Sequence, residues 1–146
     1  MALKQLGFFH SSWYKPIFKE YKKGNIDKVL WYTSKFDSFD DLPWFDRDFI
    51  PVLDQKFPNS KFINLTREEA EWKKSYKRYF NKTDKEVEIA YLDFMEHQKF
   101  IGNYFLNKKG KLITISVRNK NAFNIIANFV NKKIDYNEIL PHKNKS

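Results

Sequence analysis

The feature that most constrains the fold is a short apolar run that leads directly into a helical pattern. Phe62, Ile63 and Leu65 follow a Pro-Asn-Ser turn, and this run predicts a buried strand. Over residues 68–80, apolar side chains recur at the spacing of a helix. Arg67 therefore stands where a strand ends and a helix begins, a junction typical of α/β proteins.

The rest of the chain continues this alternation. Hydrophobic spacing and turn residues predict helices over residues 2–6, 16–23, 44–55, 84–107 and from Asn119 or Asn121 to Asn131, and a second strand over 111–117. Strands that alternate with helices favour a parallel sheet covered by helices. No repeat and no linker divides the chain, so we expect one domain over residues 1–146.

The junction at Arg67 has the chemistry of an anion-binding site. The first N–H groups of a helix and its positive dipole end favour negative charge, and a guanidinium can hold a phosphate at two points. Ser75, eight residues after Arg67, can supply a hydroxyl. An arginine after a strand is also common on the surface of any α/β protein, and that alternative stays open.

This segment resembles the 3'-phosphate-binding motif of sulfotransferases that use 3'-phosphoadenosine 5'-phosphosulfate (PAPS). The family pattern is an apolar strand, Arg, often Asp-Pro, and then Trp and Ser. Arg67, Trp72 and Ser75 match it in type and spacing. Glu68 and Glu69 stand where the family usually has Asp and Pro.

The resemblance continues on both sides and covers nearly the whole chain. The similar segments are DSFDDLPWFDRDFIPVLDQKFPNSKFI, YLDFMEHQKFIGNYF, KLITISV and the C-terminal ILPHKNKS. The resemblance implies a P-loop NTPase-like sulfotransferase architecture, a three-layer parallel sheet with flanking helices. It also implies PAPS as co-substrate, no metal, and transfer of sulfate to a hydroxyl or amine acceptor that the sequence does not name.

The resemblance further implies a partial domain, incomplete at its N-terminus. In such enzymes an N-terminal strand and a loop with Gly, Thr, Ser and a Lys or Arg bind the 5'-phosphosulfate. The present sequence matches the family only from the end of the next helix, at Leu3, Leu6 and Gly7, and its four glycines form no such loop. Sulfuryl transfer depends on positioning and on cations near the transferred group, so we expect little or no catalysis without that loop. Enzymatic activity therefore stays open.

Histidines are the candidates for a base that activates the acceptor. His10 lies near where the family places acceptor-side residues, and His97 aligns with a recurrent family histidine. Either one can instead be structural, His10 in a loop and His97 in the core. His142 and Lys143 belong to the C-terminal ending, where the resemblance implies a cap over the nucleotide; a frayed tail is the alternative.

The positive charge is concentrated near the C-terminus. Residues 107–146 contain nine Lys or Arg and two acidic residues, which accounts for +7 of the formal net charge of +9. Such a field attracts anionic ligands, whether nucleotide, sulfated substrate or nucleic acid. A bias toward Lys, Asn, Ile and Phe runs through the whole chain and explains the charge equally well.

Two other functions compete with an active sulfotransferase. The segment WKKSYKRYFNK interleaves aromatic and basic residues, as nucleic-acid-binding modules do. Trp72, Tyr76 and Phe80 are spaced four residues apart, however, which predicts a buried stripe with solvated lysines beside it. The other alternative is a non-catalytic sulfotransferase remnant that binds nucleotide or a partner.

Composition narrows the remaining classes. The absence of cysteine excludes disulfides, zinc–thiolate sites and cysteine nucleophiles, and the three scattered histidines have no metal-ligand spacing. No apolar run approaches the roughly 18 to 20 residues of a membrane span, and the opening MALKQLGFFHSSWY is unlike a signal peptide. These features predict a soluble, cytoplasmic protein.

Overall fold

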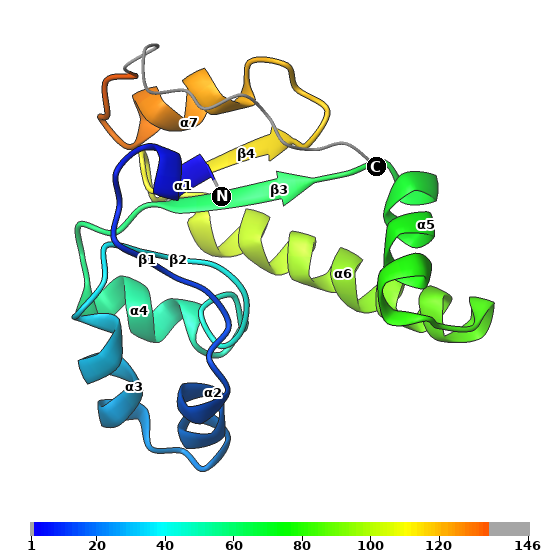
Figure 1. The fold of residues 1–146 in the computed structure, drawn as a ribbon, viewed down its shortest axis with the longest axis horizontal. Helices are drawn as coiled ribbons and strands as arrows, with labels where there is room; N and C mark the ends of the chain where they lie inside the picture. Colours follow the sequence, from blue (N-terminus) through cyan, green and yellow to red (C-terminus); the bar gives the residue numbers. More distant parts are fainter. Residues whose placement is uncertain (1, 135–146) are drawn as a thin grey trace. The chain divides into compact units, whose positions relative to one another are not determined.

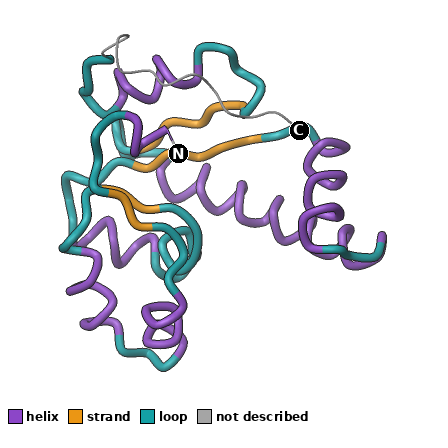
Figure 2. The backbone as a smooth tube through the Cα atoms, viewed as in Figure 1, coloured by secondary structure: helices purple, strands orange, loops and turns teal. Residues whose placement is uncertain are grey.

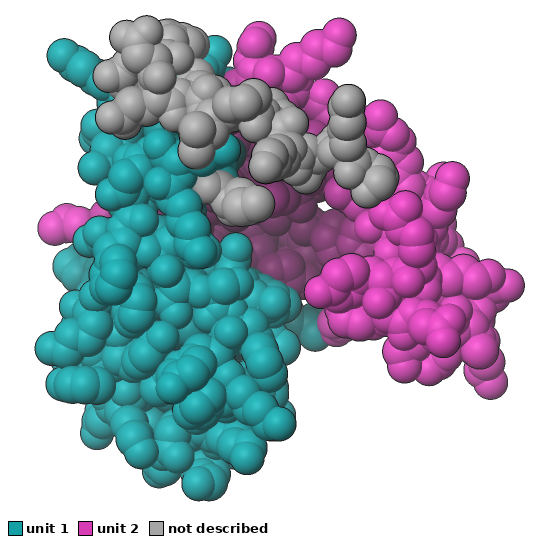
Figure 3. Space-filling view, in the orientation of Figure 1, with its two compact units in different colours: residues 1–58, 123–146 teal, residues 59–122 magenta. Residues whose placement is uncertain are grey.

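The protein was analysed as a computed structural model that describes residues 2–134. The chain forms two compact units. Unit 1 combines Met1–Pro58 with Phe123–Ser146, and unit 2 is Asn59–Ala122 (Figure 3). Helices make up most of the regular structure of both units, and each unit holds one short pair of strands (Figure 2).

Unit 2 contains a strand, two consecutive helices and a second strand. These elements are β3 (Phe62–Thr66), α5 (Glu69–Phe80), α6 (Asp84–Phe105) and β4 (Leu112–Ser116). The two strands pair in parallel from Phe62↔Leu112 to Thr66↔Ser116, as Figure 1 shows. Because parallel strands need a crossover, α5 and α6 together form the connection between them.

The core of unit 2 lies between this strand pair and α6. Ile101 and Phe105 on α6 and Ile115 on β4 are buried, and Val87 is buried at the start of α6. The rings of Phe62 and Phe105 lie 4.7 Å apart between centroids. The side-chain amides of Asn64 on β3 and Gln98 on α6 also exchange two hydrogen bonds, of 2.7 and 3.1 Å. These contacts fix β3, and hence the residue that follows it, against α6.

Unit 1 is built from short helices and a two-residue strand pair. Its elements are α1 (Ala2–Gln5), β1 (His10–Ser11), α2 (Lys15–Lys22), α3 (Ile26–Thr33), β2 (Ser38–Phe39), α4 (Ile50–Lys56) and nearly all of α7 (Ala122–Phe129). β1 and β2 pair in parallel, with His10 opposite Ser38. In the buried interior the Trp44 indole N–H donates a 3.0 Å hydrogen bond to the Thr33 hydroxyl, which satisfies the polar groups of both residues.

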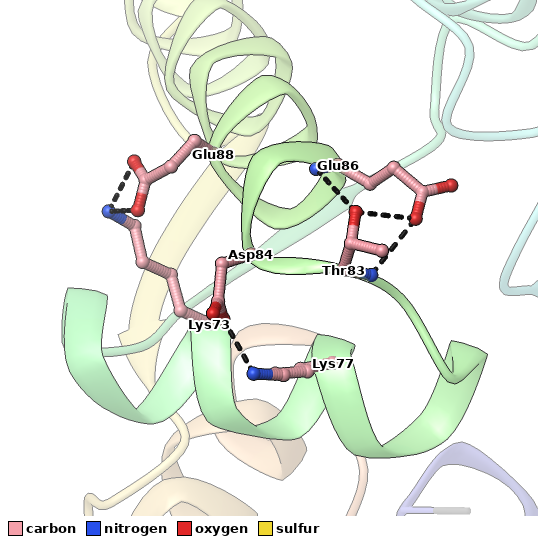
Figure 4. A network of polar contacts seen from close by, with 6 residues as sticks. All are labelled: Lys73, Lys77, Thr83, Asp84, Glu86 and Glu88. Carbon is pink, nitrogen blue, oxygen red and sulfur yellow. Dashed lines mark hydrogen bonds and ion pairs between the residues drawn. The ribbon is translucent and has the colours of Figure 1, made fainter.

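The connection between α5 and α6 is fixed by charged and capping contacts (Figure 4). The Thr83 hydroxyl and the Glu86 carboxylate form a capping box at the start of α6, in which each satisfies a backbone N–H of the other residue. Lys77 and Asp84 pair at 2.6 Å, and Lys73 on α5 reaches Glu88 on α6 at 2.7 Å. Because α5 carries no fully buried side chain, these polar contacts help to hold it against α6.

Most predicted helices and strands are confirmed. The strand β3 is not buried as predicted, because none of its residues is fully buried and Leu65 is 51% exposed. The short strands β1 and β2 were not predicted, and two helices also differ from the prediction. The helix predicted over residues 44–55 begins only at Ile50, and turns precede it. Pro51 in its first turn explains this, because proline has no N–H to donate to the carbonyl four residues earlier. The helix α3 was not predicted, because Gly24-Asn25 was interpreted only as the end of the preceding helix. Asn25 also precedes the first turn of α3, as the N-cap residue.

The prediction of a mixed α/β protein is confirmed, because both described strand pairs are parallel and accompanied by helices. The described strand pairs have two strands each and do not test the predicted three-layer P-loop sheet, which stays a prediction. The single partial domain also stays a prediction. Among residues 2–134, no helix is both long and apolar enough to cross a membrane.

The capping box generates a pH-dependent prediction. Hydrogen bonds from Lys82 and then from Thr83 lower the pKa of Glu86 to about 2, from an ordinary value of 4.5. The lowered pKa means that the charged carboxylate stabilises the fold fully above pH 4.5 and that this contribution disappears as the pH falls toward 2. In urea unfolding, wild type should exceed Glu86→Gln in stability at neutral pH, and the difference should vanish near pH 2.

Glu96→Gln, on an exposed position of the same helix, is the control for removing one carboxylate from α6. A stability difference between wild type and Glu86→Gln that stays constant down to pH 2 would show that the ionised Glu86 carboxylate is not the source of the stabilisation.

Candidate functional site

Arg67 is the first residue after β3 and is half-buried. The backbone then passes through the N-cap residue Glu68, whose carbonyl accepts a 2.8 Å hydrogen bond from the N–H of Trp72. Among residues 2–134 the Arg67 guanidinium makes no hydrogen bond and no ion pair. Its donors are thus unused by the described part of the protein.

Ser75 lies in the second turn of α5, in the same unit as Arg67, and is half-buried. A serine inside a helix often donates to the carbonyl one turn earlier. In the described part of the chain, the Ser75 hydroxyl makes no hydrogen bond. The two residues predicted to hold a 3'-phosphate therefore both have unused donors in unit 2.

Two of the three acidic residues near this junction, Glu69 and Glu71, are paired with cations. Glu69 binds Lys73 at 2.6 Å, and Lys73 also contacts Glu88. The hydrogen bonds that Lys73 donates, first to Glu69 and then to Glu88, raise the pKa of Lys73 above its usual value. Glu71 is held by both the Nε and an Nη of Arg118, with an Nε···O distance of 2.8 Å. The pairing reduces the repulsion that Glu69 and Glu71 would exert on an anion beside Arg67.

The aromatic residues of α5 are less buried than predicted. Trp72 and Tyr76 are half-buried, and Phe80 is 53% exposed, so the stripe is not a buried one. The three rings form a ladder, with centroids 4.9 and 4.7 Å apart. Phe94 of α6 stacks on Trp72 as well, at 5.0 Å. The ladder is therefore packed within itself and against α6 even though its outer end reaches solvent.

This ladder leaves little room for base stacking at Trp72. Tyr76 and Phe94 are both nearly parallel to the indole, at interplanar angles of 10° and 27°. Nucleic-acid-binding modules need a free aromatic face on which a base can stack. Trp72 is thus better explained as a packing residue that orients α5 than as a base-stacking platform.

A second polar cluster lies in unit 1, at the carboxyl ends of β1 and β2. His10 Nδ1 lies 2.8 Å from the Ser38 hydroxyl, and His10 Nε2 lies 3.3 Å from a carboxylate oxygen of Asp40. Ser12 donates to the other carboxylate oxygen of Asp40. The parallel register explains the arrangement, because His10 faces Ser38 across the strand pair and Ser12 and Asp40 follow the two strands.

The chemistry of these partners fixes the roles of the His10 ring atoms. An ionised carboxylate only accepts hydrogen bonds, so neutral His10 must carry its proton on Nε2 and accept at Nδ1 from Ser38. The imidazole side chain is only 3% exposed, whereas that of Asp40 is 53% exposed. Within this cluster Asp40 is therefore the group that an acceptor can reach. The sequence prediction named His10 and missed Asp40, whose partner Ser12 lies 28 residues away in the chain.

His97 is the remaining predicted site residue among those that the structure describes. His97 is half-buried on α6, next to Gln98, which bonds Asn64. His142 and Lys143 lie outside the described residues. Within residues 2–134 no three His, Asp or Glu side chains are placed to hold a metal ion.

The comparison with protein families identifies the chain. The family model described as "Sulfotransferase domain" matches residues 4–145. The chain belongs to the sulfotransferase family. Searches of the curated proteins and of the solved structures return no match. The family match spans both Arg67 and Ser75 as well as the His10 cluster, so both clusters belong to a sulfotransferase domain.

Because Arg67 has no described hydrogen bond or ion pair, we expect its replacement to have little effect on stability. Arg67→Ala should leave the free energy of unfolding within about 0.5 kcal/mol of wild type, because no described hydrogen bond or ion pair of the protein is lost. Trp72→Ala, which removes stacking with Tyr76 and Phe94, should destabilise by about 2 kcal/mol. Chemical denaturation followed by circular dichroism measures both. A large loss in Arg67→Ala would show that this arginine has a structural role.

The His10 cluster makes a spectroscopic prediction. At alkaline pH, the ¹⁵N shifts of the His10 ring should report the tautomer protonated on Nε2. Asp40→Asn should weaken this preference, because its amide can donate as well as accept. Ser38→Ala is the matched variant that should leave the preference in place, and a change of tautomer in Ser38→Ala alone would contradict the assignment.

Proposed function

We propose that this sulfotransferase-family protein binds PAPS, or its product 3'-phosphoadenosine 5'-phosphate, and that Arg67 and Ser75 hold the 3'-phosphate. The observation that carries the proposal is an unneutralised guanidinium and a free hydroxyl on either side of the first turn of α5. Both positions match the family's motif in residue type and spacing, and the chain's membership of the family supports the transfer of that role.

Each group supplies a distinct contact in this proposal. The guanidinium donates two parallel hydrogen bonds to phosphate oxygens and supplies the opposing charge. The Ser75 hydroxyl donates a further bond, and the first N–H groups of α5 add a weaker favourable field. Three glutamates near this helix end would repel a phosphate. The pairs Glu69–Lys73 and Glu71–Arg118 offset two of these negative charges, and the charge of Glu68 remains.

PAPS would supply the activated sulfuryl group. For transfer to a hydroxyl or amine, the protein must also take a proton from the acceptor. We keep His10 as a candidate base; within its own cluster Asp40 is the exposed group, and His10 and Ser12 orient its carboxylate. His97 is retained as the second candidate base, half-buried on α6. As finer parts of the same proposal we keep the three-layer P-loop architecture, a single domain, and a nucleotide-capping role for His142 and Lys143.

A second candidate function is nucleotide binding without transfer. It is favoured by one observation: none of the four glycines of the printed sequence belongs to a phosphate-binding loop. Positioning and cations at the 5' end contribute most of the acceleration in this kind of chemistry, so residues 1–146 alone would then bind the nucleotide and leave the sulfate in place.

Titration with 3'-phosphoadenosine 5'-phosphate in a calorimeter tests the proposal. Arg67→Ala should weaken binding at least tenfold, about 1.5 to 3 kcal/mol, because charge-assisted hydrogen bonds are lost. Arg78→Ala, on the exposed part of the same helix, is the matched control and should bind as wild type does. Adenosine 5'-phosphate, which lacks the 3'-phosphate, should be insensitive to Arg67→Ala.

Equal binding of the nucleotide by wild type and Arg67→Ala would remove Arg67 from the site. Transfer of sulfate from labelled PAPS to a panel of acceptors would then separate the two candidate functions. A third outcome, steep loss of binding with salt and tight binding of oligonucleotides, would instead identify a nucleic-acid-binding module.

A further inference from the structure

We infer that Arg118 is a second guanidinium of the nucleotide site, which binds the 3'-phosphate together with Arg67 while Glu71 holds it in place. This inference rests on the proposed function and adds a residue to it that the motif does not contain. It comes from three observations in unit 2: the strand register, the geometry of the Arg118–Glu71 pair, and the position of Glu71 one helical turn before Ser75.

The strand register brings the two arginines to one edge. β3 and β4 are parallel, and their last paired residues are Thr66 and Ser116. The N–H of Val117 donates to the carbonyl of Thr66 at 2.9 Å, so pairing continues one step beyond the strands. Arg67 follows Thr66, and Arg118 follows Val117. Neighbouring strands lie about 5 Å apart, so both backbones leave the sheet at the same edge within reach of long side chains.

The ion pair with Glu71 leaves part of the Arg118 guanidinium unused. Glu71 accepts from Nε at 2.8 Å and from Nη2. A guanidinium has five N–H donors in a planar fork, so the other Nη group keeps both of its hydrogens free for a second anion. The Arg118 side chain is 71% exposed, which keeps that edge open to a ligand.

The position of Glu71 determines which face of α5 Arg118 binds. Residues four apart on a helix are neighbours, about 6 Å between their Cβ atoms, so Glu71 and Ser75 lie on one face of α5. An anion held by the Ser75 hydroxyl would be repelled by an unpaired Glu71. Arg118 offsets that charge and, by binding Glu71, is held to the face of α5 that also carries Ser75. Glu71 is thus a positioning residue, and Arg118 is a ligand-binding one.

Calorimetric titration with 3'-phosphoadenosine 5'-phosphate tests this arrangement. Arg118→Ala should weaken binding about tenfold, with no comparable loss for adenosine 5'-phosphate. Arg118→Lys keeps the charge but lacks the planar fork, so it should lose affinity severalfold for the same ligand and serves if the alanine variant folds poorly. Arg78→Ala again controls for removing one arginine from unit 2.

A double variant distinguishes binding from simple neutralisation. If Arg118 only neutralises Glu71, the combination Glu71→Gln with Arg118→Ala should restore wild-type affinity, and the inference is wrong. If Arg118 contacts the phosphate, the double variant should stay weak. If Arg118→Ala binds the nucleotide as tightly as wild type does while Arg67→Ala binds it more weakly, the inference about Arg118 is wrong and the proposed function stands. Absence of nucleotide binding by wild type would overturn the proposed function and this inference together.

Discussion

The parallel pairing of β3 with β4 is the constraint on which the candidate nucleotide site depends. It brings the end of one apolar run to the end of another that lies about fifty residues later, so that Arg67 and Arg118 leave the sheet at one edge. The pairing is itself held by α6, through the buried Ile101 and Phe105 and through the reciprocal amide bonds of Asn64 and Gln98. Loss of that packing would separate the anion-binding groups without changing any of them.

Charge balance around α5 explains how an acidic helix start can still serve an anion site. Acidic residues in a first turn are ordinary partners of the helix dipole and would compete with a phosphate for it. Here Lys73 and Arg118 bind two of them, while Arg67 keeps its charge free. The same cations tie α5 to α6 and to the end of β4, because Lys73 reaches Glu88 and Arg118 follows that strand. Lys73 and Arg118 thus both hold α5 in place and offset the negative charge of its first turn.

Unit 1 repeats the principle on a smaller scale. A pair of two-residue parallel strands places His10 against Ser38 and leaves Ser12 and Asp40 at the carboxyl ends. The buried imidazole of His10 orients the exposed carboxylate of Asp40. Solvent therefore reaches Asp40 but hardly reaches His10. In both units the carboxyl ends of parallel strands collect the polar groups, as is usual for ligand sites in α/β proteins.

The sequence by itself determined most of the longer helices and strands, the mixed α/β class and the family, because hydrophobic spacing and the run from Phe62 to Ser75 are properties of neighbouring residues. Arg67 and Ser75 could be named for the same reason. Asp40 and Arg118 could not, because their significance comes from partners 28 and 47 residues away that only strand pairing brings near. The tertiary structure also decided that the Trp72 ladder is half-exposed, since helical spacing shows which residues share a face but not how deeply that face is covered.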